Sequence, residues 1–311
     1  MTRTPAGTTK SRLFGRHDYL APLSVPTGQK PVDIMNTIWR KNDSFMDIST
    51  YTPGTAIAII SAMVFLSAMI AYLSNDIISL WLGFAIVSVP TIILLNDLNT
   101  PTPLPIRFNR QRREVCVPLK TGAHWIVPWE TVTAIAVEQK TVGLGGGSSV
   151  GMLFIGFDNP DPEAPYSERA FSIGIACGGG ESAMAQWECV RSYMEIGPDA
   201  VADNTARFNR TKGILATYIE GIKEAATQKG WFLALLWDGF FSLFVFNCLL
   251  IDVFERKKLL PLPDFTDPTI IEWSSPLPPE QWAKRSPELE AAIFVREAEL
   301  ANGKQPRPTS T

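Results

Sequence analysis

The sequence predicts an α+β membrane protein: a transmembrane helical hairpin, an antiparallel β domain with a closing helix, and a further apolar C-terminal helix. Three observations lead to this fold class. Residues 55–95 form two apolar runs that are separated only by a short polar break. Short alternating segments and one amphipathic stretch fill residues 103–198. A second apolar concentration covers residues 231–254.

The hairpin is expected over residues 51–96. Each apolar run is about as long as a helix needs to cross the ~30 Å hydrocarbon core, and neither contains Lys, Arg, Asp or Glu. Thr52-Pro53 suits a helix start, and Pro90 is tolerated in a membrane helix. The alternative is a buried hairpin in a soluble core, but such helices usually carry a polar stripe.

Positive charges set the expected orientation. The hairpin turn has no Lys or Arg, whereas Arg40 and Lys41 precede the first run and several arginines follow the second. The positive-inside rule therefore places an N-terminal segment, residues 1–50, and the β domain in the cytoplasm. Within that segment we expect disorder over residues 1–23 and a short amphipathic helix or loop at the membrane surface over residues 33–45. The segment lacks the apolar core of a cleavable signal peptide.

The β domain is expected over residues 97–200. Period-two alternation separated by turn residues predicts antiparallel strands in PLPIRFNR, EVCVPL, AHWIVPW, TVTAIAVEQ, SVGMLFIGF and AFSIGIA. Apolar positions at helical spacing over 181–194 predict a helix that packs on the sheet and ends at Gly197-Pro198. Six or seven strands and one closing helix match the plan of a pleckstrin-homology-like (PH-like) barrel.

Three segments follow the β domain. Residues 201–230 contain an amphipathic helix over 207–228. Residues 231–254 are long enough to span the bilayer, or form a re-entrant or in-plane helix pair hinged at Asp238-Gly239. An ionisable residue in such a run is a candidate functional group, but we expect Asp238 only to lie at an interfacial hinge. Residues 255–311 form a Pro-rich tail with a short helix near 287–302, expected to be a solvated extension, with a partner-binding arm as the alternative.

Composition excludes several classes of function. A net charge of −3 gives no support for nucleic-acid binding. The four cysteines are widely spaced, so we expect reduced, half-buried thiols in a reducing compartment. With two histidines and no ligand spacing, no metal site or cofactor is expected. His124 is expected on a sheet face, and GLGGGSS at 143–149 at a hairpin tip, since it lacks the ending of a nucleotide-binding loop.

The sequence offers no catalytic constellation, and its best surface feature is a basic turn. Arg107, Arg110, Arg112 and Arg113 follow the hairpin closely. Cations near an anionic leaflet gain about 1 kcal/mol each. These arginines are therefore candidates for binding membrane lipids or an acidic partner; a solvated hairpin with ordinary positive-inside bias is the alternative. The turn CGGGES at 177–182 opens a helix and is a weaker candidate for an anion or for an enzyme site.

RFNRQRREV, VPWE and WECVRSYMEIGP together resemble a family of uncharacterised bacterial inner-membrane proteins that carry a domain of unknown function and are often encoded near type VI secretion toxins. The resemblance covers roughly residues 36–199. It implies a multi-pass inner-membrane protein without enzymatic activity, acting as an immunity or adaptor protein for a secreted toxin. Trp129, in the VPWE motif, is a further candidate for binding the membrane or a partner. A lipid-sensing membrane scaffold is the alternative function.

Overall fold

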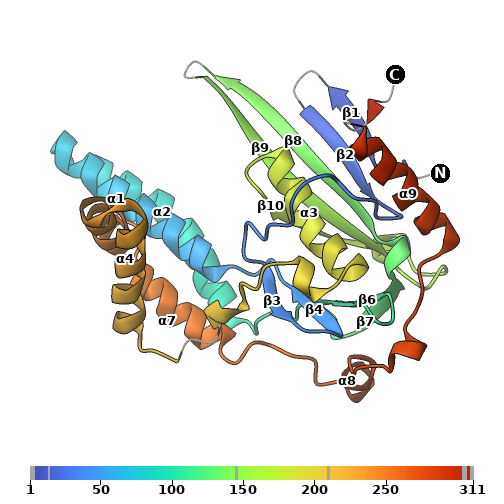
Figure 1. Ribbon diagram of the computed structural model, residues 1–311. Helices are drawn as coiled ribbons and strands as arrows, with labels where there is room; N and C mark the ends of the chain where they lie inside the picture. Colours follow the sequence, from blue (N-terminus) through green and yellow to red (C-terminus); the bar gives the residue numbers. More distant parts are fainter. Residues whose placement is uncertain (1–3, 13–14, 144–145, 209–210, 303–306, 309–311) are drawn as a thin grey trace. The chain divides into compact units, whose positions relative to one another are not determined.

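The computed structural model describes residues 4–12, 15–143, 146–208, 211–302 and 307–308 (Figure 1). Two structural units divide the chain. The β unit contains Met1–Thr50, Leu104–Thr205 and Asp264–Thr311, and the helical unit contains Tyr51–Pro103 and Ala206–Pro263. The chain therefore leaves the β unit twice and returns to it twice.

Two sheets form the framework of the β unit. One has the strand order β10-β9-β8-β2-β1-β11, in which only the β1–β11 pair is parallel. Its strands are β1 (Thr8–Arg12), β2 (Gly15–Ala21), β8 (Thr133–Gly143), β9 (Gly146–Asp158), β10 (Ala170–Ala176) and β11 (Arg307–Pro308). The other is antiparallel, in the order β3-β4-β5-β6-β7. Its strands are β3 (Ile38–Lys41), β4 (Phe45–Ile48), β5 (Ile106–Asn109), β6 (Glu114–Pro118) and β7 (His124–Pro128).

Helix α3 (Gly180–Glu195) packs on β8 and β9 and closes the main core (Figure 1). Its Trp187 stacks on Trp129 with ring centroids 5.5 Å apart, and Trp129 meets Phe108 edge to face. Such aromatic pairs add about 0.5–1.5 kcal/mol beyond the area that they bury. The predicted α+β class, strands and closing helix are confirmed. Because the strands divide between two sheets, barrel closure and the PH-like plan stay predictions.

The N-terminal segment is part of the β unit. The prediction of disorder over residues 1–23 is wrong for its described residues, since β1 pairs with β2 and β2 pairs with β8. The expected helix or loop over 33–45 is also wrong, since β3 and the start of β4 lie there. Polar composition indicated disorder, but pairing with strands more than a hundred residues away supplies the burial that composition cannot show.

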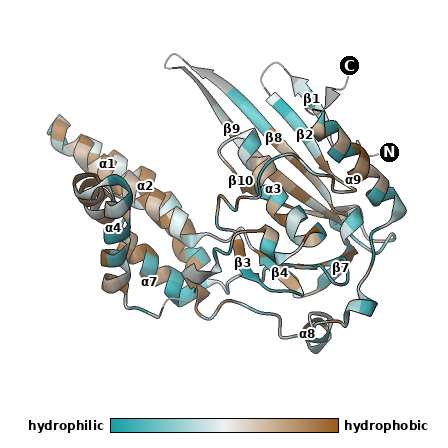
Figure 2. Ribbon diagram, in the orientation of Figure 1, coloured by the Kyte–Doolittle hydropathy of each residue, from teal (hydrophilic) through white to brown (hydrophobic). Residues whose placement is uncertain are grey.

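Two long helices dominate the helical unit. α1 (Pro53–Ser74) and α2 (Ile77–Asn99) are long and apolar enough to cross a membrane, which confirms the predicted hairpin (Figure 2). The Asp76 carboxylate caps α2 by accepting from the Ile78 N–H at 3.0 Å. The helices approach closely where a Cβ on Gly83 would lie 2.7 Å from the Ser67 Cβ, as small residues allow in membrane hairpins.

The rest of the helical unit is a bent helical pair preceded by an amphipathic helix. Its elements are α4 (Ile214–Lys229), α5 (Trp231–Leu233), the π-helix η5 (Ala234–Phe241), α6 (Ser242–Phe244) and α7 (Cys248–Leu259). The predicted hinge at Asp238-Gly239 is wrong. η5 continues through those residues, and the 64° bend lies between Phe244 and Cys248, next to the left-handed Asn247.

The tail contains α8 (Pro268–Trp273) and α9 (Pro287–Ala301). The helix near 287–302 is confirmed, but the expected solvated extension is wrong. Phe265, Ile270 and Trp273 pack around the buried Cys116, and the Trp273 indole donates to Glu114 at 2.7 Å. The tail from Asp264 onward therefore belongs to the β unit. Short 3₁₀ helices complete the chain: η1 (Trp129–Thr131), η2 (Tyr166–Glu168), η3 (Pro198–Ala200), η4 (Thr205–Phe208) and η6 (Pro279–Gln281).

Candidate functional site

The basic turn between β5 and β6 is shaped by its own side chains. Asn109 accepts hydrogen bonds from the backbone N–H groups of Gln111 and Arg112, both at 3.1 Å. Arg113 takes the left-handed conformation, with φ 53°, before β6 begins. This tight turn sends its arginines in different directions. They do not form one exposed cluster.

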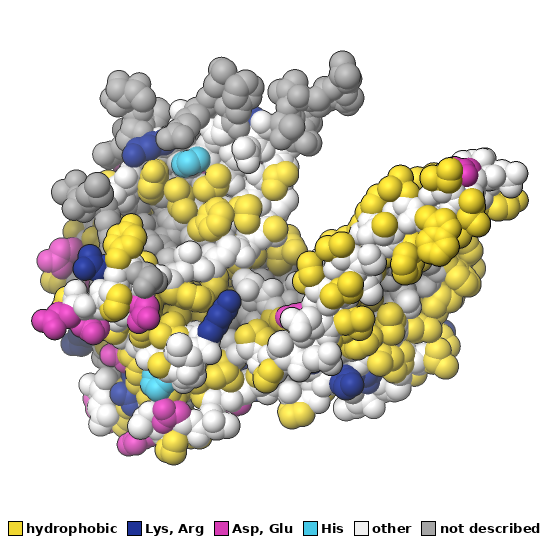
Figure 3. Space-filling view, turned by 180° about the vertical axis from the view of Figure 1, so that it is seen from behind, with side chains coloured by type: hydrophobic (Ala, Val, Ile, Leu, Met, Phe, Trp, Pro, Cys, Tyr) yellow, Lys and Arg dark blue, Asp and Glu magenta, His cyan; other side chains and the backbone are white. Residues whose placement is uncertain are grey.

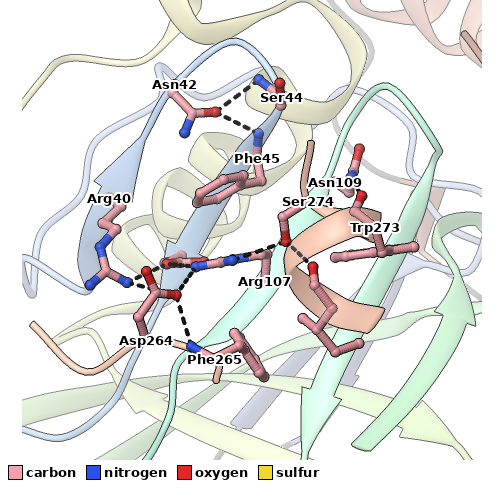
Figure 4. Close-up of polar contacts among 12 residues, drawn as sticks. Arg40, Asn42, Ser44, Phe45, Arg107, Asn109, Asp264, Phe265, Trp273 and Ser274 are labelled. Carbon is pink, nitrogen blue, oxygen red and sulfur yellow. Dashed lines mark hydrogen bonds and ion pairs between the residues drawn. The ribbon is translucent and has the colours of Figure 1, made fainter. Parts of the chain in front are cut away.

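Arg107 points into the β unit, where its side chain is 3% exposed (Figure 4). Its Nε and Nη2 donate to the two Asp47 carboxylate oxygens at 2.7 and 2.8 Å. Nη2 also donates to Asp264 at 2.8 Å, and Nη1 to the Ser274 hydroxyl at 3.0 Å. Burial opposes the charge of Arg107, but these hydrogen bonds and the two carboxylates raise its pKa above the ordinary value. Arg107 is therefore a fully paired interior cation.

Three residues of the Arg107 cluster lie close in sequence to boundaries between the two units. Asp47 comes just before the chain leaves the β unit for the first time, and Arg107 just after it returns. Asp264 is the first residue after the second return. Arg40 joins the cluster by donating to Asp47 at 3.1 Å. The cluster thus ties three separate stretches of chain together in the β unit.

Arg113 and Trp129 belong to a second buried cluster, centred on Glu195 at the end of α3. The Glu195 side chain is fully buried. It accepts hydrogen bonds from Arg113 at 2.9 and 3.1 Å, from the Trp129 indole at 2.7 Å and from Arg285 at 2.7 Å. Burial alone would raise the pKa of Glu195, but the hydrogen bonds and charge of Arg113 outweigh it and hold the pKa below its ordinary value.

Arg110 is the residue of the turn that faces a cavity. Its guanidinium lies over the Trp282 ring, 5.2 Å from the centroid, and Nη2 makes a long hydrogen bond to the Ile196 carbonyl at 3.4 Å. Its Nε is buried and has no hydrogen-bond partner among the described residues. The cavity, here named the Arg110 pocket, has a volume of about 580 Å³. It is lined by Asp43, Ser44, Arg110, Gln111, Ile196, Gly197, Pro198, Asp199, Ala200, Pro276 and Trp282.

Long-range hydrogen bonds hold the walls of the Arg110 pocket in place. The Gln111 backbone carbonyl accepts from the Ala283 N–H at 2.8 Å, and the Gln111 side chain accepts from the Leu277 N–H at 2.6 Å. On the opposite wall, the Lys41 ammonium donates to the carbonyls of Pro198 and Val201 at 2.9 and 2.5 Å. The pocket is therefore built by four chain segments, including the tail.

The candidate binding residues thus differ in burial and in position. Arg107 and Arg113 are buried, so the prediction that the turn is an exposed basic surface is wrong for them. Trp129, the candidate outside the turn, is buried as well. Arg112 is half-buried, and its Nε donates to the Trp273 carbonyl at 2.9 Å. Only Arg110, also half-buried, lines the pocket.

Sequence reasoning missed the partners of these arginines: Asp47, Asp264, Glu195, Trp282 and Arg285. No local motif marks them, because each pairs with a residue far away along the chain. An indirect signal was available. A cation next to a strongly apolar strand needs a carboxylate once the strand is buried.

The described parts of the other motifs make structural contacts. At the helix start after Cys177, a Cβ on Gly180 would lie 3.0 Å from a Glu138 carboxylate oxygen, so a protein carboxylate already lies beside the first turn of α3. His124 in β7 lies 3.8 Å from the Asp267 carboxylate, which itself caps α8. Residues 144–145 of the glycine-rich stretch lie outside the described residues, and Gly143 pairs with Gly146 across the β8–β9 hairpin.

The cysteines are free thiols, as predicted, but Cys116, Cys177 and Cys189 are buried and only Cys248 is half-buried. Burial raises the pKa of Cys116 and of Cys189 to about 12, and that of Cys177 to about 11. Thiols with such pKa values carry almost no thiolate near neutral pH, so they are inert. Among the described residues, no group of three or more His, Cys, Asp or Glu side chains is arranged to hold a metal ion.

Comparison with known proteins gives no match to a family model, to a curated protein or to a solved structure.

Proposed function

We propose that this chain is a non-enzymatic binding protein anchored in the bacterial inner membrane. It binds a protein partner through the Arg110 pocket. The observation that carries the proposal is the state of Arg110. The Arg110 Nε has no hydrogen-bond partner among the described residues. The guanidinium lies over the Trp282 indole and lines a cavity of about 580 Å³. A guanidinium held in this way offers a planar, charged surface for recognition.

The chemistry of the pocket favours a protein surface. An acidic side chain of a partner fits Arg110, because arginine and carboxylate form paired, charge-assisted hydrogen bonds. Asp43 and Asp199 line the same pocket. Their charges repel a polyanion such as a nucleic acid or an anionic headgroup layer, whereas a surface with both acidic and basic groups satisfies all three charges.

The helical hairpin supplies the anchor in this proposal. α1 and α2 place apolar side chains in lipid, and the turn between them carries no positive charge. The positive-inside rule then favours a cytoplasmic β unit. The anchored pocket meets partners that approach or enter the membrane from the cytoplasmic face.

The resemblance to inner-membrane proteins encoded near type VI toxins supports a more specific role. In that role the partner is a secreted toxin or a secretion-related protein, and binding neutralises it or delivers it. Neutralisation by binding needs no catalytic group. Among the described residues that line the pocket, Arg110 is the one Lys or Arg side chain, and an anchored pocket of this kind is suited to such recognition.

Co-expression of the full chain with the product of the neighbouring toxin gene tests this function. We expect the two proteins to co-purify from detergent-solubilised membranes and the chain to protect cells from the toxin. Arg110→Glu is expected to abolish both effects, while Lys120→Glu, the same charge change at an exposed turn, preserves them. Absence of binding and of protection by the unaltered chain would refute the toxin-related role.

The lipid-sensing alternative has less support. It needs several free cations on the basic turn, but Arg107 is paired with Asp47 and Asp264, and Arg113 with Glu130 and Glu195. Two of the four cations are thus already paired with carboxylates, so only Arg110 and Arg112 remain to gain from an anionic leaflet.

A further inference from the structure

We propose that Ala206–Pro263 binds one leaflet of the bilayer and returns to the side from which it entered, so that it forms no third span. This segment thereby provides a second membrane-binding surface, whose partner is the acyl region of a single leaflet. The inference is independent of the proposed binding function, since it uses no residue of the Arg110 pocket.

Connectivity is the first argument. The three parts of the β unit are held together by strand pairing, by the Arg107–Asp264 ion pair and by the Arg285–Glu195 ion pair. One folded unit lies on one side of a membrane. Each excursion of the chain from it must therefore cross the bilayer an even number of times. The first excursion meets this condition with α1 and α2.

The second excursion meets it only with no crossing. Two crossings require two spanning helices, and the described residues of Ala206–Pro263 contain at most one candidate, the bent pair Trp231–Phe244 and Cys248–Leu259. α4 has 16 residues and is therefore about 24 Å long, short of the ~30 Å core. It also exposes Glu220, Lys223 and Glu224. A single crossing by the bent pair would place the tail on the opposite side of the bilayer from the rest of the β unit, where it could not form the Arg107–Asp264 and Arg285–Glu195 ion pairs.

Contacts within the helical unit agree with this path. The Lys258 ammonium near the end of α7 donates to the Thr100 carbonyl at 2.7 Å, and the Thr102 hydroxyl donates to the Lys258 carbonyl at 3.1 Å. Both threonines follow the last turn of α2. Arg256 of α7 also donates to Thr217 in the first turn of α4 at 3.1 Å. The start of α4 and the end of α7 therefore lie at the polar base of the hairpin, away from its turn.

The surface of this segment is suited to lipid. Figure 3 shows hydrophobic side chains over much of the visible face of the helical unit as a whole. The segment itself exposes large apolar side chains along α5, η5 and α6. They are Trp231, Phe232, Leu233, Leu235, Leu236, Trp237, Phe240 and Phe244. An exposed apolar surface of this extent marks an interaction site. Charged side chains on α4 and at the end of α7 suit an interfacial position, as in helices that lie in one leaflet.

Cysteine labelling of the full chain in membrane vesicles tests the proposal. In a Cys248→Ser background, single cysteines replace Gln228 before the bent pair, Lys257 near its end, Lys120 in the β unit and Ser74 at the hairpin turn; all four positions are exposed. A membrane-impermeant maleimide is added to right-side-out and to inverted vesicles. Unaltered Cys116, Cys177 and Cys189 are buried and serve as the unreactive background.

We expect the cysteines at 228, 257 and 120 to react in the same vesicle orientation, and the cysteine at 74 to react only in the opposite one. Reaction at 228 and 257 in opposite orientations would overturn the proposal, because it requires a third span. A nitroxide on Phe244→Cys is expected to collide with oxygen more than with a water-soluble nickel chelate. Collision with the chelate as free as at position 120 would show that the segment lies in water, which also overturns it.

Discussion

Arg107 keeps its charge inside the β unit because two carboxylates lie within hydrogen-bond distance of it. The guanidinium also lies against aromatic rings, 3.8 Å from the Phe45 centroid and 5.0 Å from the Phe265 centroid. Buried ion pairs gain little over an apolar core, but losing one partner leaves an uncompensated charge and is costly. At the scale of single residues, the Arg107 and Glu195 clusters therefore specify how distant segments fit together.

Asp47→Ala tests the first cluster. It removes the bidentate partner of Arg107, so we expect the free energy of unfolding to fall by about 3–5 kcal/mol. Thermal or urea unfolding of the full chain in detergent measures this loss. Glu163→Ala, which removes the same charge at an exposed position, is the control and is expected to change little. Equal stability of the two variants would contradict the structural role of Asp47.

Glu195 predicts a pH dependence. Its folded-state pKa lies below the ordinary value of 4.5, so its contribution to stability is present above that value and disappears as the pH falls through the folded-state pKa. Glu195→Gln is expected to be less stable than the unaltered chain at neutral pH, and the difference is expected to shrink in acid. Unfolding curves across the acidic range measure it. A difference that is constant with pH would contradict the assignment.

The tail illustrates the scale of elements. Its composition is that of a solvated arm, yet it brings Asp264 to Arg107, Trp273 to Glu114 and Arg285 to Glu195. It also supplies Trp282 to the Arg110 pocket. α8 and the chain on either side of it thus pack on the β unit, although they follow the second excursion of the chain from it.

Truncation after Pro263 tests this role of the tail. It leaves Arg107 with fewer partners and exposes the apolar surface around Cys116, so we expect the β unit to lose its cooperative unfolding transition. Near-UV circular dichroism and thermal unfolding measure the loss. Truncation after Ala301, which keeps α8 and α9, is the control and is expected to retain the transition. A normal transition in the shorter chain would show that the tail is dispensable.

At the scale of the whole molecule, the sequence predicts elements better than assembly. The apolar runs of α1 and α2 and the alternation of β5 to β10 are local signals, and the structure confirms them. The local sequence of β1, β2 and the tail gives little indication of their structure. Their positions depend on pairing with distant strands and on ion pairs such as Arg107–Asp264. The Arg110 pocket likewise depends on contacts between segments that are distant in the sequence. Its arginine is visible in the sequence, whereas Trp282 joins it only through the fold.

In our proposal, the Arg110 pocket binds a protein partner at the membrane. Site-specific photo-crosslinking in living cells tests it most directly, with the crosslinking amino acid at Pro276 on the pocket and at Lys120 as a control, both of them exposed. We expect a discrete protein adduct at position 276 that is absent at position 120 and is lost with Arg110→Glu. The same adducts at both positions, or an adduct that persists with Arg110→Glu, would contradict it.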